Sequence, residues 1–317
     1  GDDREAKAAA VEAAAEALEA AGMGEILALP RARVPVVKFT VPATGTKVDV
    51  TVNNRLAVAN TKLLADYAAL DARLAGLVML VKHWAKRRAV NDPYSGTLSS
   101  YCYVLMCIAC LQGRDPPALP VLQGLPPTHR AEIRGWDCDF CDDVAALQGF
   151  GAANAEGLAD LLWAFFEYWA WRHDYRGGVV SVRCGGVIPK EAKGWTKRVG
   201  SERHLLCVED PFETTHDLGR TVDRQTRDVM RKEFMRAATL LRDSADPMAA
   251  FPAVREAILR NYRRYERMSA EEIQLDRYQK FRKLGRFEEF LVRGGDYAGA
   301  AEARARAPGA TTAAGTW

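Results

Sequence analysis

The feature that most limits what this chain can fold into is the short run VDVTV at residues 48–52. Its valines alternate with Asp49 and Thr51, which is the period-two pattern of a strand with one buried face. The pair Asn60-Thr61 follows shortly afterwards. Holding an acid beside a core is costly unless something compensates its charge. The run therefore favours a bound cation or a phosphate-bearing ligand near Asp49.

Basic and hydroxyl side chains follow in a segment with a helical pattern. Lys82 and Lys86 are four positions apart, which places both ammonium groups on one helix face. The run GTLSSY then adds Ser100 and Tyr101. A strand carboxylate, two neighbouring lysines, a hydroxyl and an aromatic ring together predict a nucleoside-triphosphate site.

The order of these motifs resembles one family. The matching runs are VDVTVNN, VKHWAKRR, GTLSSYCYVLM, GWT and VEDPFETTHDLGRTV. From about residue 32 to about residue 242, the chain resembles the terminal uridylyltransferases and related cytoplasmic poly(A) polymerases. These belong to the polymerase-β-like nucleotidyltransferases. Several motifs in the family's order are more specific than one short pattern.

The resemblance implies an α+β fold in three parts. Residues 1–56 are expected to be the C-terminal part of a mixed-sheet nucleotidyltransferase palm, packed on a mainly helical central, PAP-associated domain at 57–250. Residues 251–317 are expected to form an arginine-rich helical extension with a disordered tail. Eleven Lys or Arg residues occur at 255–293 against seven Asp or Glu. An RNA-binding extension and a solvated amphipathic helix both remain open for this stretch.

The resemblance also predicts missing parts. Family members carry a Gly-Ser helix and an Asp-x-Asp strand before the helix that residues 1–22 resemble. Asp2 and Asp3 are adjacent, whereas two carboxylates on one strand face need a spacing of two. We therefore expect an N-terminally truncated segment that lacks the first two metal carboxylates and is inactive by itself. The alternative is a non-catalytic RNA-binding scaffold derived from the family.

In the family reading, Asp49 is the third carboxylate of a two-metal site that holds Mg²⁺ or Mn²⁺. Two such cations clamp the attacking and leaving oxygens of an in-line displacement. One carboxylate cannot hold two cations that each need several oxygen ligands. Asn60 and Thr61 are expected to contact the ribose. For Thr61 an alternative is the N-cap of the helix that follows.

Other residues of the nucleotide site are implied in the same way. Lys82, Lys86 and Ser100 are expected to contact the triphosphate, and a solvated charged face is the alternative for the lysines. Tyr101 is expected to stack under the base, which does not discriminate among bases. Its alternative is an ordinary core aromatic.

Base selection is assigned to Asp210, Glu213 and His216. Histidine at the last position marks the uridine-preferring branch, because its ring N–H can donate to a uracil carbonyl oxygen and its bulk crowds a purine. The expected function is a template-independent RNA 3′-terminal uridylyltransferase that uses UTP. A poly(A) polymerase that uses ATP is the alternative.

For the RNA strand, Lys38 and Arg172 match basic positions of the family. Glu167 stands where a basic residue is expected, which weakens a detailed path for the RNA. The aromatic residues at 163–171 have helical spacing and are interpreted as core rather than as a base-stacking platform.

Composition limits the remaining classes. The 317 residues carry a net charge of +3, too small to indicate a polyanion partner. No apolar run reaches the 18 or more residues of a membrane span. The seven cysteines have no disulfide spacing and favour a reducing compartment, taken as the cytoplasm. The CxxC pairs at 107–110 and 138–141 imitate a zinc site, but core packing is preferred.

The periodic pattern predicts the elements themselves. Helices are expected at 4–21 and 225–242, an aromatic helix at 157–171, and strands at 32–39, 48–52 and 179–183. Residues 57–123 are expected to be helical, with breaks at Gly76, at 91–93 and at 114–117, and residues 190–200 to form a basic loop.

Overall fold

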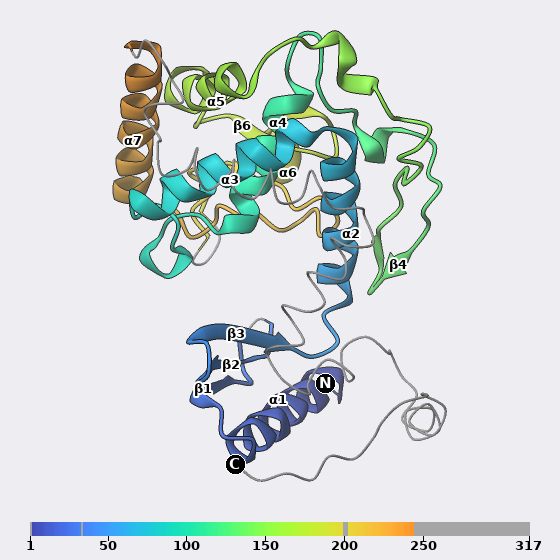
Figure 1. Cartoon of the computed structure of the whole chain (residues 1–317), viewed down its shortest axis with the longest axis vertical. Coiled ribbons are helices and arrows are strands. Elements are labelled where there is room, and N and C mark those ends of the chain that lie inside the picture. Colours follow the sequence, from blue (N-terminus) through green and yellow to red (C-terminus); the bar gives the residue numbers. More distant parts are fainter. Residues whose placement is uncertain (1, 33, 199–201, 244–317) are drawn as a thin grey trace. The chain divides into compact units, whose positions relative to one another are not determined.

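The computed structural model describes residues 2–32, 34–198 and 202–243 (Figure 1). The described residues group into two compact units, 2–52 and 53–243. The expected arginine-rich extension and tail lie outside the described residues. The mixture of helices and small sheets confirms the α+β class.

The first unit is one helix on a three-stranded antiparallel sheet. Its elements are α1 (Asp2–Ala20), β1 (Gly24–Leu29), β2 (Val36–Val41) and β3 (Thr46–Thr51), with strand order β1-β2-β3. Val11 and Leu18 of α1 share a buried cluster with Val37, Phe39 and Val41 of β2. The residues between these on β2 therefore face away from α1.

Strand β1 was not predicted, and its irregular pairing explains why. Glu25 has a φ of 51°, and the register with β2 shifts between Gly24 and Leu27. Such a bulge interrupts the period-two pattern on which strand prediction depends. The predicted strands at 32–39 and 48–52 exist, but as β2 and β3 they are displaced by a few residues.

The second unit is mainly helical. Its longer helices are α2 (Arg55–Leu70), α3 (Ala72–Arg87), α4 (Ser100–Gln112), α5 (Leu158–Glu167) with a π-helical turn at Tyr168–Arg172, and α7 (Arg224–Asp243). Its short helices are η1 (Pro93–Ser95), η2 (Leu122–Gly124), η3 (Phe150–Ala153) and α6 (Lys190–Lys193). The small helix α6 occupies part of the predicted basic loop.

Two small sheets accompany these helices. Strands β4 (Glu132–Ile133) and β5 (Trp136–Asp137) form a hairpin, and the second sheet has the order β7-β6-β8. Its strands are β6 (Gly178–Ser181), β7 (Gly186–Pro189) and β8 (Cys207–Val208). β6 pairs antiparallel with β7 and parallel with β8. The two-residue strand β8 leads into the predicted base-selecting segment.

Trp84 lies at the centre of the helical core. Its ring centroid is 4.7 Å from that of Phe166 and 5.1 Å from that of Phe234, which joins α3 to α5 and α7. Phe165, Phe166 and Trp169 are fully or almost fully buried. The core interpretation of the aromatic helix is therefore confirmed for these rings, whereas Trp171 is 43% exposed.

The predicted helix break at Gly76 is wrong. The break lies at Asp71, whose Oδ1 accepts a hydrogen bond of 2.8 Å from the backbone N–H of Arg73 and so caps α3. Gly76 lies inside α3, where an added Cβ would stand 2.9 Å from Cδ2 of Leu158. The glycine allows α3 and α5 to approach closely and does not end a helix.

All seven cysteines are free thiols. Cys107 is buried in α4 and Cys110 half-buried, while Cys138 and Cys141 are buried near β5. Within the described residues, neither pair gathers a third ligand of a metal site. Among the described helices, none is long and apolar enough to cross a bilayer.

Candidate nucleotide-binding site

Asp49 and Lys38 contact each other in the first unit. They are opposite one another in the register of β2 and β3, and Lys38 Nζ is 3.2 Å from Asp49 Oδ2. Both side chains are on the sheet face away from α1, and the Asp49 carboxylate is 57% exposed. The predicted metal ligand and the predicted RNA contact thus form one ion pair.

This arrangement fits a two-metal centre poorly without further ligands. Each hard divalent cation takes about six oxygen ligands, several of them supplied by carboxylates. The side chain that faces Asp49 across the strand pair is an ammonium and not a second acid. Asp49 alone therefore cannot hold two cations.

Asn60 and Thr61 lie on α2 in the second unit. Thr61 Oγ1 donates a hydrogen bond of 2.7 Å to the carbonyl of Ala57, and the N-cap position of α2 is Asn54. The N-cap alternative for Thr61 is therefore wrong. Asn60 Oδ1 is buried and has no hydrogen-bond partner among the described residues. A buried acceptor of this kind is normally satisfied, and a ribose hydroxyl would satisfy it.

Lys82 and Lys86 lie one turn apart on α3, as predicted. Lys82 is half-buried and Lys86 is exposed. Neither ammonium forms an ion pair with another residue of the described part of the chain. Both charges are therefore available to an anion such as a triphosphate.

The first residues of α4 present Ser100 and Tyr101. Ser99 caps the helix by accepting from the N–H of Cys102 at 3.1 Å, so Ser100 is the first helical residue. Ser100 Oγ donates to Asn91 Oδ1 at 2.9 Å, which fixes the hydroxyl. The N-terminus of a helix carries a partial positive charge and free N–H groups that attract phosphate.

Tyr101 reaches from α4 to the predicted base-selecting segment. Its hydroxyl donates to Asp210 Oδ2 at 3.4 Å. Burial, followed by the charge of Asp210, raises the pKa of Tyr101 far above its usual value, so the hydroxyl stays protonated. The fold thus joins two predicted site residues that are distant in sequence.

Residues 209–217 form a closed hairpin, called the base hairpin below. Glu209 and Asp217 pair as an antiparallel bridge, and the N–H of Asp210 donates to the carbonyl of His216 at 3.1 Å. Asp210 Oδ1 accepts from the N–H groups of Phe212 and Glu213 at 3.0 and 2.9 Å. One oxygen of Asp210 therefore holds the hairpin turn in shape.

Asp210 is 5% exposed. Its burial raises the pKa of the carboxyl above the usual range, although the two backbone N–H groups act in the opposite direction. Glu209 beside it behaves differently. Lys193 Nζ lies 2.6 Å from its carboxylate, Ser181 and Arg183 also donate to it, and the pKa of Glu209 is lowered in spite of burial.

His216 is oriented by a residue that the sequence analysis did not single out. Arg220 Nη1 is 2.7 Å from His216 Nδ1 and 3.4 Å from Nε2. A guanidinium only donates hydrogen bonds, and the shorter of the two distances favours Nδ1 as the acceptor, with the ring proton on Nε2. The only available signal was the spacing of four between the two residues in the matching run HDLGR.

The predicted RNA contact Arg172 is already paired. Its Nε donates to Glu167 Oε1 at 2.7 Å, although the arginine side chain is 68% exposed. Glu167 is the residue that replaces a basic one in the family pattern. The pair therefore carries little net charge toward an RNA strand.

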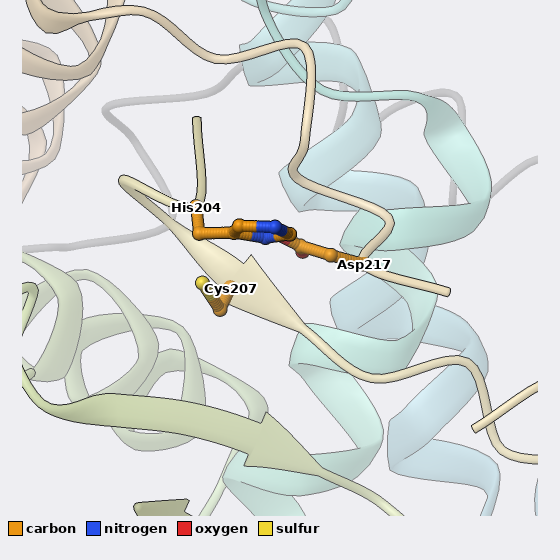
Figure 2. A group of neighbouring side chains, drawn as sticks. All are labelled: His204, Cys207 and Asp217. Carbon is orange, nitrogen blue, oxygen red and sulfur yellow. The ribbon is translucent and has the colours of Figure 1, made fainter. Parts of the chain in front are cut away.

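Three buried side chains at the end of the base hairpin have donor atoms within 4.8 Å of one another: His204, Cys207 and Asp217, the last residue of the hairpin (Figure 2). His204 Nδ1 is 2.8 Å from Asp217 Oδ2. Asp217 Oδ1 accepts from the N–H groups of Val208 and Gly219. Sequence reasoning missed this group, because its members are separated by loops.

Comparison with known proteins identifies the family of the chain. Residues 2–69 match the family described as poly(A) RNA polymerase, mitochondrial-like, central palm domain, and residues 157–216 match the Cid1 family poly A polymerase. A solved structure of a cytoplasmic RNA terminal U-transferase is 40% identical with a TM-score of 0.65, covering 73% of this chain and 72% of that one. The chain belongs to the terminal uridylyltransferase and poly(A) polymerase family.

The chain matches family members named as uridylyltransferases and others named as poly(A) polymerases. Terminal uridylyltransferase cid1 of Schizosaccharomyces pombe is 40% identical over 236 residues, which is 69% of this chain and 58% of that protein. Poly(A) RNA polymerase cid13 of the same organism is 36% identical over 241 residues, which is 74% of this chain and 41% of cid13. The chain thus spans about half the length of these family members.

A structure of the Cid1 poly(U) polymerase with Mg and 3′-dATP bound has a TM-score of 0.67 at 40% identity, covering 75% of this chain and 73% of that one. The matches include a uridylyltransferase and a poly(A) polymerase, so the preferred base has to be inferred from the site residues.

Proposed function

We propose that this protein is a template-independent RNA 3′-terminal nucleotidyltransferase that adds uridylates from UTP. The observation that supports uridine is the contact between Arg220 and His216. The shorter distance from Arg220 to Nδ1 favours Nδ1 as the acceptor and Nε2 as the protonated ring nitrogen. An N–H at that place can donate to a uracil carbonyl oxygen, whereas the pairing edge of adenine would meet it with an amino group.

Other residues of the second unit supply the remaining contacts. Lys82 and Lys86, which form no ion pair with the residues that the structure describes, provide positive charge for the triphosphate, and the N-terminus of α4 at Ser100 provides N–H groups. Asn60 provides an unsatisfied acceptor for a ribose hydroxyl. Tyr101 provides an aromatic ring for any base. Glu213 is proposed at the base edge with Asp210 and His216.

Catalysis is proposed to need Mg²⁺ or Mn²⁺ and the 3′ end of an RNA. Asp49 is proposed as one metal ligand, with Lys38 beside it. This carboxylate alone is insufficient for two cations. We therefore expect these residues alone to bind a nucleotide without transferring it. The free thiols support a reducing compartment such as the cytoplasm.

The decisive experiment offers UTP, ATP, CTP and GTP separately to the full-length protein with an RNA primer. We expect UTP to be incorporated most efficiently. Dominant incorporation of ATP would replace the uridylyl proposal with the poly(A) polymerase alternative. Failure with all four nucleotides in Mg²⁺ and in Mn²⁺ would favour an RNA-binding scaffold.

Replacing His216 tests whether this residue selects the base. His216→Asn removes the ring that crowds a purine, so the ratio of kcat/KM for UTP over ATP should fall about tenfold or more. The matched control is His129→Asn, a half-buried histidine outside the base hairpin. An unchanged ratio in His216→Asn would remove His216 as the selector.

A further inference from the structure

The buried pair of His204 and Asp217 joins a residue before β8 to the last residue of the base hairpin. The His204 side chain is 2% exposed and that of Asp217 is fully buried. The His204 ring points at the Asp217 carboxylate, while Cys207 lies on β8 beside them (Figure 2). Trp195 stacks on His204 with ring centroids 5.2 Å apart and an angle of 2° between the planes. The imidazole is therefore held in one orientation.

Asp217 also connects two residues that flank the base hairpin, Val208 and Gly219. Its Oδ1 accepts from the N–H of Val208 at 3.2 Å and from the N–H of Gly219 at 2.9 Å. The N–H of Leu218 donates to the carbonyl of Val208 at 2.9 Å. Asp217 is the covalent neighbour of His216, and Gly219 is the neighbour of Arg220. The same carboxylate therefore fixes the backbone next to both residues of the base-reading contact.

The group does not have the character of a metal site. Burial, followed by the charge of Asp217, raises the pKa of the Cys207 thiol far above its usual value, so it is a poor source of the thiolate that a metal binds. The Lys190 ammonium lies close by and donates to the carbonyl of His204 at 2.6 Å. Both oxygens of Asp217 already have hydrogen-bond donors: Oδ2 contacts His204 Nδ1, and Oδ1 accepts from two backbone N–H groups.

We propose that His204 is a positioning residue for base selection. It acts through Asp217 and does not touch the nucleotide. The N–H at Nδ1 completes the hydrogen bonds of a fully buried carboxylate, and this carboxylate sets the places of His216 and Arg220. The inference rests on the proposed function, because it concerns how that site distinguishes UTP from ATP.

Removing the Nδ1 donor leaves a buried carboxylate without its charge-assisted hydrogen bond. The hairpin can relieve this only by moving Asp217 toward another donor or toward water. Such a movement changes the His216 position relative to the base but leaves the triphosphate contacts on α3 and α4 in place. KM for UTP should therefore rise about tenfold, while KM for ATP and kcat change much less.

Three variants of the full-length protein test this. His204→Phe keeps a ring for Trp195 and deletes the donor. His204→Asn places an amide N–H near the position of Nδ1, and asparagine tolerates the φ of 49° at this residue. Val179→Ala removes buried volume from the cluster that holds Trp195 and Cys207, without touching the hydrogen bonds. KM and kcat for UTP and ATP are measured together with Tm.

The expected result is loss of UTP preference in His204→Phe, recovery in His204→Asn, and normal preference in Val179→Ala at a comparable loss of Tm. If His204→Phe is not obtained folded, His204→Gln replaces it, because its amide extends beyond the Nδ1 position. If His204→Phe, or the His204→Gln that replaces it, prefers UTP over ATP as strongly as the parent does, the inference is overturned. An equal loss in Val179→Ala, or stoichiometric zinc in the purified protein, also overturns it.

The two proposals fail in different ways. A parent enzyme that prefers ATP overturns the uridylyl proposal. In that case the positioning inference is tested with the nucleotide that the parent prefers. KM for that nucleotide should rise in His204→Phe and recover in His204→Asn. Any other result overturns the inference.

Discussion

The hydroxyl of Tyr101 and the carboxylate of Asp210 are 3.4 Å apart although 109 positions separate them in sequence. Tyr101 belongs to the first turn of α4, which Ser99 caps, and Asp210 begins the turn of the base hairpin. The contact joins the surface expected to stack under any base to the segment expected to distinguish one base from another.

Two substitutions of Tyr101 should separate these tasks. Tyr101→Phe removes only the hydroxyl, so we expect a rise of a few-fold in KM for the preferred nucleotide with stacking kept. Tyr101→Ala also removes the ring, which is worth roughly 1–3 kcal/mol per stacked base, and should raise KM for every nucleotide about tenfold or more. Steady-state kinetics with each nucleotide measures both. Equal effects of the two substitutions would contradict a stacking ring.

Lys86 should act on the triphosphate as a charge. Lys86→Met is expected to weaken binding of UTP severalfold and to leave binding of uridine unchanged, because the nucleoside carries no phosphate. Arg87→Met is the matched control, since it removes one exposed positive charge from the same helical turn. Titration at low and high salt checks this, because screening weakens the Lys86 contribution. A loss of the same size in Arg87→Met would indicate a general charge effect.

Gly219 should be intolerant of a side chain. An added Cβ would overlap the carbonyl oxygen of Leu206, which belongs to backbone that cannot easily move. Gly219→Ala is therefore expected to lower the free energy of unfolding by about 3 kcal/mol or more. Gly186→Ala on β7 has no atom within 4 Å of the new Cβ and should cost about 1 kcal/mol or less. Urea unfolding of both variants tests the difference.

His173 should make stability depend on pH. Burial, followed by the positive charge of Lys190, lowers its pKa from 6.5 to about 4. Between these values the unfolded chain binds a proton that the folded chain does not. Stability is therefore kept above pH 6.5 and lost as the pH falls toward 4, by about 2 kcal/mol between pH 7 and pH 5.

The variant His173→Phe checks the source of this dependence. It should show a smaller loss of unfolding free energy between pH 7 and pH 5 than the parent, measured by urea titration at both values. A loss of the same size in the variant would assign the pH dependence to other groups.

The sequence predicted local spacing better than contacts between separate segments. Lys82 and Lys86 share a helix face as the spacing predicts, because helical periodicity is a local property. The pairing of Lys38 with Asp49 depends on the register of two strands, which the sequence pattern did not specify. The same applies to Arg172 with Glu167, where a π-helical turn sets the approach.

Positions that depend on backbone irregularity were the least predictable. The bulge at Glu25 concealed β1, and the cap at Asp71 was overlooked in favour of Gly76. Arg220 and His204 act through hydrogen bonds between separate segments, so neither had a local pattern that marked its role.

The closed form of the base hairpin has an evolutionary consequence. Asp210 and His216 are joined through the backbone, and the Asp210 carboxylate also holds the N–H of Glu213. Replacing Asp210 removes the acceptor that shapes this turn, so its effect will not simply add to that of a change at Glu213 or His216. A lineage that moves from one nucleotide to another has to pass through combinations of changes, and its order of mutations matters. Nucleotide preference in such a protein is inherited as a property of the whole base hairpin.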